Sequence, residues 1–272
     1  MPYFRHEGID FHYKDEGEGM PFLFQHGLGG SIEQPSGLYE PVRDVRFVSC
    51  DFRGHGETRR FGSPDKFGFA AFTHDLLALL DHLGIARAVV GGISMGAGAA
   101  LHFALHYPER VSGLVLSRVA WQDEPQPESS RSVYELVARL IRECGAEEGR
   151  RRFLETDVYA RMAEAYPDAA ASLARQFEYP YAEETWPKLE AIPADAPNFD
   201  RREWATIQVP TLVLANRLDP LHPFAYGELL ASRIPHASFK ELVSKSVDPS
   251  KHVEQCRAYV SEFLQTLVER GG

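Results

Sequence analysis

The sequence predicts an α/β fold in which a mostly parallel sheet lies between layers of helices and carries an inserted helical segment. Short apolar runs alternate with helical patterns up to about residue 122 and again from about residue 206. The stretch between them has no convincing strand pattern. We therefore expect a core of residues 1–122 and 206–272 and a helical cap of residues 123–205.

The strand predictions rest on runs of Val, Ile, Leu and Phe without polar alternation, which is typical of strands buried on both faces. Residues 9–16 alternate more clearly and are expected to form an antiparallel edge strand. The buried strands are expected at residues 22–25, 45–50, 88–93, 111–116, 211–215 and 237–242.

The helix predictions rest on apolar residues spaced three and four positions apart. Such spacing marks a helix through Phe72, Leu76, Leu79, Leu80 and Leu83, and a terminal helix through Val253, Cys256, Val260, Phe263, Leu264 and Leu267. Residues 95–106 and 223–234 are expected to be helical as well. In the cap, residues 132–135 carry a capping-box pattern, and Gly145 is placed to end the helix that follows.

Composition and charge exclude several classes of partner. With 29 basic and 39 acidic residues, the net charge of −10 disfavours nucleic acid and anionic membranes. No run of 18 apolar residues occurs, and residues 1–7 lack the apolar stretch of a signal peptide. Three widely spaced cysteines suit a reducing compartment. We expect a cytoplasmic protein with no metal or other cofactor; a homodimer is compatible with the sequence.

Ser94 is the strongest candidate for a reactive side chain. It lies in Gly92-Ile93-Ser94-Met95-Gly96, directly after an expected strand and directly before an expected helix. A nucleophile on so tight a turn takes a strained backbone conformation, which only small residues two positions before and after it can accommodate. The helix N-terminus then favours negative charge beside its hydroxyl group.

The loop His26-Gly27-Leu28-Gly29-Gly30 follows another expected strand. Its glycines allow backbone N–H groups to converge on a ligand oxygen, so the N–H groups of Leu28 and Met95 are candidates for an oxyanion hole. The His26 side chain is expected to hydrogen-bond the backbone and to have a structural role.

Taken together, these motifs resemble the α/β-hydrolase fold family. The resemblance also includes the Asp51-Phe52-Arg53-Gly54-His55-Gly56 turn and the Tyr107-Pro108-Glu109-Arg110-Val111 segment, and it covers the whole chain except the cap. It implies a catalytic triad of serine, acid and histidine in that chain order.

The resemblance implies Asp219, which follows the strand at residues 211–215, as the acid, with Asp123 in reserve. It places the histidine after the last strand, where His252 is the only histidine. His252 is therefore expected to be the base, although it lies closer to the terminal helix than in the family pattern. His222, three residues after Asp219, is expected to pack in its loop, and His236 precedes the last strand.

The resulting hypothesis is a serine hydrolase that cleaves a small or medium carboxylic ester or lactone through an acyl-enzyme. Its partner would be a small ester-like substrate. Because Ser94 replaces a carboxylate at the turn, dehalogenase and epoxide-hydrolase chemistry are excluded. Carbon–carbon bond hydrolysis and perhydrolysis use the same triad and stay open. A non-catalytic ligand-binding or receptor protein is the alternative if His252 does not reach Ser94.

Overall fold

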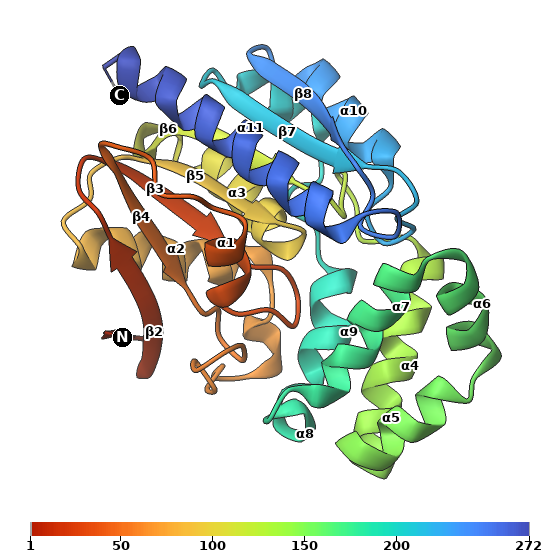
Figure 1. Cartoon of the computed structure of the whole chain (residues 1–272). Coiled ribbons are helices and arrows are strands. Elements are labelled where there is room, and N and C mark those ends of the chain that lie inside the picture. Colours follow the sequence, from red (N-terminus) through yellow and green to blue (C-terminus); the bar gives the residue numbers. More distant parts are fainter. Residues whose placement is uncertain (1, 272) are drawn as a thin grey trace.

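An eight-stranded sheet forms the centre of the computed structural model, which describes residues 2–271 (Figure 1). Its strand order is β1-β2-β4-β3-β5-β6-β7-β8. β2 pairs antiparallel with β1 and β4, and the other neighbours pair parallel. The strands are β1 Tyr3–His6, β2 Ile9–Glu16, β3 Met20–Gln25, β4 Val45–Cys50, β5 Ala88–Ile93, β6 Val111–Ser117, β7 Thr211–Asn216 and β8 Ala237–Leu242.

The predicted fold class is confirmed, but the prediction of β2 as the edge strand is wrong. β1 covers its outer side, with Tyr3 paired to His12 and His6 paired to Ile9. Glu7 and Gly8 connect the two strands with φ values of 46° and 76°, as a tight two-residue hairpin requires. Four residues are too few for β1 to show a recognisable alternation.

Helices cover both faces of the sheet (Figure 1). The side chains of β3 alternate between two cores: Leu23 packs in the cluster that contains α2 and α3 residues, whereas Phe22 and Phe24 pack in the cluster with α11. The core helices are α1 Glu33–Gly37, α2 Phe69–His82, α3 Met95–His106, α10 Phe224–Arg233 and α11 Pro249–Glu269. None of the helices among residues 2–271 is long and apolar enough to cross a membrane.

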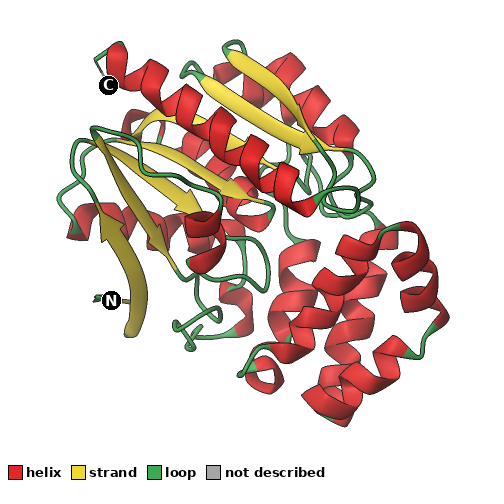
Figure 2. Cartoon of the chain, in the orientation of Figure 1, coloured by secondary structure: helices red, strands yellow, loops and turns green. Residues whose placement is uncertain are grey.

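Six helices between β6 and β7 gather at one end of the sheet, and we call them the cap (Figure 2). They are α4 Glu128–Cys144, α5 Ala146–Leu154, α6 Asp157–Ala165, α7 Pro167–Ala174, α8 Ala182–Thr185 and α9 Pro187–Ala194. α4 begins four residues before the predicted capping box, since Pro127 takes the N-cap position. Gly145 ends α4 with φ 77°, in agreement with the prediction.

The cap has its own apolar core, which extends onto two loops of the sheet. Val137, Phe153 and Leu189 are at its centre. Leu221, from the loop after β7, is buried in the same cluster, and Leu28, from the loop after β3, packs against it. The carboxyl ends of β3 and β7 therefore face apolar cap residues.

Candidate active site

Ser94 lies on the turn between β5 and α3, at the N-cap position of the helix. Its φ of 56° and ψ of −114° are a strained conformation for a residue with a side chain. A Cβ atom on Gly92 would lie 2.2 Å from the carbonyl carbon of Gly96, and one on Gly96 would lie 2.5 Å from the carbonyl oxygen of Gln25. Both glycines are thus sterically required for this turn.

The loop after β3 packs directly against this turn. A Cβ atom on Gly27 would lie 3.3 Å from the Cβ atom of Ser94. The ring of His26 has both nitrogens occupied: Nδ1 donates to the carbonyl of Gly27 at 2.8 Å, and Nε2 accepts from the N–H of Phe52 at 3.0 Å. His26 therefore holds two loops together, and its predicted structural role is confirmed.

Asp51 fixes the same loop from the end of β4. Its carboxylate accepts hydrogen bonds from the N–H groups of Ile32 at 2.8 Å and Glu57 at 2.9 Å, and it lies 2.7 Å from Nδ1 of His12. A buried carboxylate with several donors holds its surroundings in one arrangement. These contacts connect Ile32, in the loop after β3, to the end of β4.

The imidazole at Ser94 belongs to His222. Its Nε2 atom lies 2.8 Å from Oγ of Ser94, and its Nδ1 atom lies 2.9 Å from Oδ2 of Asp219. The prediction that His222 only packs in its loop is therefore wrong. The tautomer that satisfies both contacts donates from Nδ1 to the carboxylate and accepts the serine proton at Nε2.

The loop after β7 explains this position. Leu218 has a φ of 58°, and Oδ1 of Asp219 accepts the N–H of Leu221 at 3.2 Å, which closes an Asx turn. The turn folds the chain back on itself, so a residue three positions after Asp219 returns to the same carboxylate. The Asp-Pro-Leu-His-Pro sequence after a buried strand is the signal that could have indicated this turn.

His252 does not reach Ser94, and its placement as the base at this site is wrong. It lies in the first turn of α11, which Asp248 caps by accepting the N–H of Lys251. Nδ1 of His252 contacts the carbonyl oxygen of Val243 at 2.8 Å, and among the described residues Nε2 has no hydrogen-bond partner. Burial lowers the pKa of His252 to about 4.

Asp123 and His236 have surroundings of a different kind. Asp123 pairs with the guanidinium of Arg201 at 2.6 Å. His236 is exposed before β8. Asp219 is thus the acid that contacts an imidazole at Ser94.

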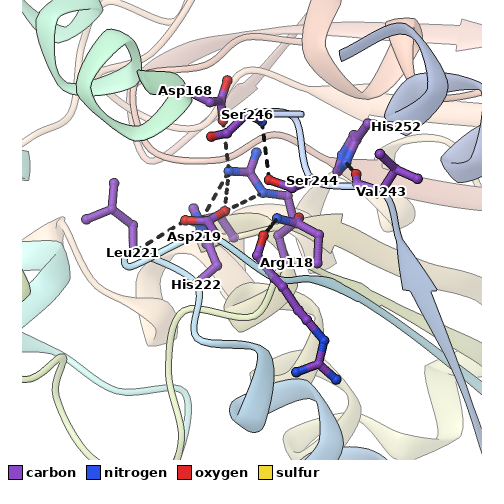
Figure 3. A network of polar contacts seen from close by, with 12 residues as sticks. Arg118, Asp168, Asp219, Leu221, His222, Val243, Ser244, Ser246 and His252 are labelled. Carbon is purple, nitrogen blue, oxygen red and sulfur yellow. Dashed lines mark hydrogen bonds and ion pairs between the residues drawn. The ribbon is translucent and has the colours of Figure 1, made fainter. Parts of the chain in front are cut away.

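Arg118 is a polar residue of this site that we did not predict. It follows β6, and its side chain is 8% exposed. Its Nη2 and Nε atoms lie 2.6 Å and 3.1 Å from Oδ2 of Asp219 (Figure 3). No sequence pattern predicts such a contact for a single arginine at the end of a strand.

The charges at the site shift two pKa values. Burial alone raises the pKa of Asp219, but the nearby charges of His222 and Arg118 outweigh burial and hold that pKa well below its ordinary value. Burial lowers the pKa of His222, Asp219 opposes this shift, and Arg118 adds to it. Near neutral pH the site therefore holds a carboxylate and a neutral imidazole.

A cleft of about 1000 Å³ opens between the cap and the loop after β3. Leu28, Gly29, Arg175, Gln176, Tyr179 and Tyr181 are among its lining residues. Gln176 donates from Nε2 to the carbonyl oxygen of Leu28 at 3.3 Å. The cleft thus meets the loop that carries one of the two candidate oxyanion donors.

Within the described part of the chain, one group of potential metal ligands lies outside this site. Side-chain atoms of His6, Glu7 and His74 lie within 4.8 Å of one another. The Glu7 carboxylate is already paired with Arg53 at 3.2 Å and Lys66 at 3.3 Å. Because these two cations repel a metal ion, the group does not support a metal site.

Comparisons with known proteins identify the family to which this fold belongs. The model of the alpha/beta hydrolase fold family matches residues 20–246. A 3-oxoadipate enol-lactonase from Acinetobacter baylyi is 28% identical over 91% of this chain and 88% of its own length. The chain therefore belongs to the alpha/beta hydrolase fold family.

Solved structures give the same result. The crystal structure of an enol-lactonase from Burkholderia xenovorans is 26% identical, with a TM-score of 0.71 over 98% of both chains. A thermophilic esterase from Thermogutta terrifontis, 23% identical, shares the fold with a TM-score of 0.75 over 97% of both chains. The predictions of this family and of a hydrolase of the carboxylic ester type are confirmed.

Proposed function

We propose that the protein is a serine hydrolase that cleaves a small or medium carboxylic ester or lactone through an acyl-enzyme on Ser94. In this proposal His222 is the general base and Asp219 orients it. The contact of 2.8 Å between Nε2 of His222 and Oγ of Ser94 carries the proposal. The match to a named enol-lactonase along nearly the whole chain supports the substrate class.

Acylation would begin as Oγ of Ser94 attacks the carbonyl carbon and its proton passes to Nε2 of His222. The imidazolium formed keeps its Nδ1 proton directed at Asp219, which stabilises the new charge. The leaving alkoxide then takes the proton from Nε2. In a lactone this alcohol stays attached to the acyl group. Water, activated by the same imidazole, would release the acid.

The oxyanion of the tetrahedral intermediate would be held by the N–H groups of Leu28 and Met95. Met95 is the first residue of α3, so its N–H has no partner within the helix and the helix dipole favours an anion there. Each such donor contributes about 3 kcal/mol to transition-state stabilisation. The packing of Gly27 against Ser94 supports the position of the second donor.

The surroundings of the site favour a partly apolar acyl group. Leu221, next to His222, and Leu28 both pack in the cap cluster with Val133, Tyr134 and Val137. A hydrocarbon chain that replaces water against these side chains gains about 25 cal/mol for each Å² that it buries.

Labelling with a fluorophosphonate probe, which requires an activated serine, tests the proposal. We expect labelling of the wild type at pH 8 and none of Ser94→Ala, together with loss of p-nitrophenyl butyrate hydrolysis. Ser232→Ala, which removes an exposed hydroxyl that donates to the carbonyl of Leu229 on α10, is the matched control and should label normally. A folded wild type that does not label would favour the alternative of a ligand-binding protein.

A further inference from the structure

Arg118 connects the loop that carries Asp219 and His222 with the cap. Its backbone N–H donates to the carbonyl oxygen of Leu214 at 2.8 Å, which places it beside the end of β7. Its φ of 51° is rare for a residue with a side chain. This backbone conformation costs free energy. Such strain is concentrated at functional sites, which indicates that the position of the Arg118 side chain serves a function.

The guanidinium contacts two carboxylates from different parts of the fold. Nη2 lies 2.6 Å from Oδ2 of Asp219 in the core and 3.4 Å from Oδ2 of Asp168, in the first turn of cap helix α7. Figure 3 shows the guanidinium between these two residues. Nη2 also lies 3.4 Å from Nδ1 of His222.

Arg118 and His222 share one oxygen atom. Oδ2 of Asp219 lies 2.6 Å from Nη2 of Arg118 and 2.9 Å from Nδ1 of His222. Because Nε and Nη2 of Arg118 both donate to this one oxygen, two charge-assisted hydrogen bonds hold Oδ2 in place. Without Arg118, the contacts that hold the Asp219 side chain among residues 2–271 would be those with His222 and the N–H of Leu221.

We propose that Arg118 is a positioning residue, which holds Asp219 against His222 and connects that carboxylate through Asp168 to cap helix α7. The proposal rests on the proposed function, because Arg118 acts only through the proposed acid and base. It also gives the charge of the cap residue Asp168 an influence on the site.

The charged and titratable groups around His222 determine the direction of the expected effects. Asp219 faces it from its own loop, Arg118 from the end of β6 and Lys245 from the segment after β8. Asp168 of α7 faces Arg118, and Tyr134 of α4 lies near Asp219. Arg118 and Lys245 oppose an imidazolium and Asp219 favours it. Removing Arg118 should raise the pKa of His222, and removing the charge of Asp168 should lower it.

The test compares the pH dependence of kcat/KM for p-nitrophenyl butyrate in three variants. In Arg118→Met, the acid limb of the kcat/KM profile should move to higher pH by about one unit. The plateau value of kcat/KM should fall at least about tenfold. Arg118→Lys, which keeps the charge but loses the two-point contact, should restore the limb but not the full plateau. Asp168→Asn should move the limb the opposite way, by a few tenths of a unit.

Arg139→Met is the matched control, since Arg139 is an exposed arginine of α4. Its limb should coincide with that of the wild type. An unshifted limb in folded Arg118→Met, or shifts of the same sign in Arg118→Met and Asp168→Asn, would overturn the proposal. If Arg118→Met does not fold, the test depends on the acid limbs of Arg118→Lys and Asp168→Asn. An acid limb in Asp168→Asn that matches the wild type, or that lies at higher pH, would then contradict the proposal. A wild type without Ser94-dependent turnover would overturn the proposed function itself.

Discussion

The imidazole of His222 lies 2.8 Å from the hydroxyl of Ser94, although the two residues are 128 positions apart in the sequence. The loop after β7 supplies both the imidazole and the carboxylate that contacts it. The base and its orienting acid thus depend on one Asx turn rather than on two loops from different strands.

Gly96 is expected to be indispensable for the Ser94 turn. A Cβ atom there would meet the carbonyl oxygens of Gln25 and His26 at 2.5 Å and 2.7 Å, and neither backbone group can move freely. Gly96→Ala should lower the free energy of unfolding by about 1–3 kcal/mol and reduce fluorophosphonate labelling. Gly37→Ala is the matched control, because a Cβ atom there meets nothing within 4 Å. Equal melting temperatures and labelling rates for both variants would contradict the steric requirement.

Asp219, rather than Asp123, should be the residue on which turnover depends. Asp219→Asn removes the charge that stabilises the imidazolium and leaves Arg118 without its buried partner. Activity should fall about 10³- to 10⁴-fold, and urea denaturation should show lower stability. Asp123→Asn, at a carboxylate that pairs with half-exposed Arg201, should keep activity within a few-fold. A larger loss in Asp123→Asn would point to the reserve acid.

The activity should extend to lower pH than an ordinary histidine allows. Burial and Arg118 lower the pKa of His222 from its usual value of 6.5 despite the opposing charge of Asp219. A general base works in its neutral form, so kcat/KM should stay on its plateau down to the lowered pKa and fall below it. We expect an acid-limb midpoint below 6.5 for p-nitrophenyl butyrate. A midpoint above about 7 would show that the imidazolium is stabilised instead.

Lys188 should make the stability of the fold depend on pH. Its Nζ atom donates to the carbonyl oxygen of Gly54 at 2.7 Å, and burial lowers its pKa from 10.5 to about 7. Between these two values the unfolded chain binds a proton that the folded chain releases, so Lys188 makes the folded state less stable than a neutral side chain would. This penalty shrinks as pH rises from about 7 to about 9.

The comparison of wild type with Lys188→Met isolates this contribution. From about pH 7 to about pH 9 the wild type should gain on the order of 2 kcal/mol in free energy of unfolding relative to the variant, measured by urea denaturation. Lys240→Met, at a less buried lysine of β8, is the control. A stability difference between Lys188→Met and wild type that does not change with pH would contradict the lowered pKa.

The features that depend on local patterns were predictable from the sequence. Ser94 is recognisable because its strand, turn and helix are adjacent in the chain, and the buried strands are recognisable as unbroken apolar runs. β1 was not predicted because it is short. α4 begins before the predicted capping box because a proline takes its N-cap position. Neither error affects the site.

The histidine and Arg118 could not be found in the same way. The position of His222 depends on how the Asx turn of Asp219 folds the loop, which strand and helix patterns do not describe. His252 is favoured by its place after the last strand, but the cap of α11 at Asp248 directs its ring to Val243. The contact of Arg118 depends on which strands are neighbours in the sheet, because β6 and β7 lie side by side.

The most direct test of the proposed base compares His222→Gln with His252→Gln in the rate of fluorophosphonate labelling of Ser94 at pH 8, with folding checked by circular dichroism. We predict that His222→Gln lowers the rate constant at least about 10³-fold. His252→Gln should keep it within about threefold, because the ring of His252 contacts Val243 and not Ser94. A wild-type rate in His222→Gln, together with a collapse in His252→Gln, would contradict the assignment of His222 as the base.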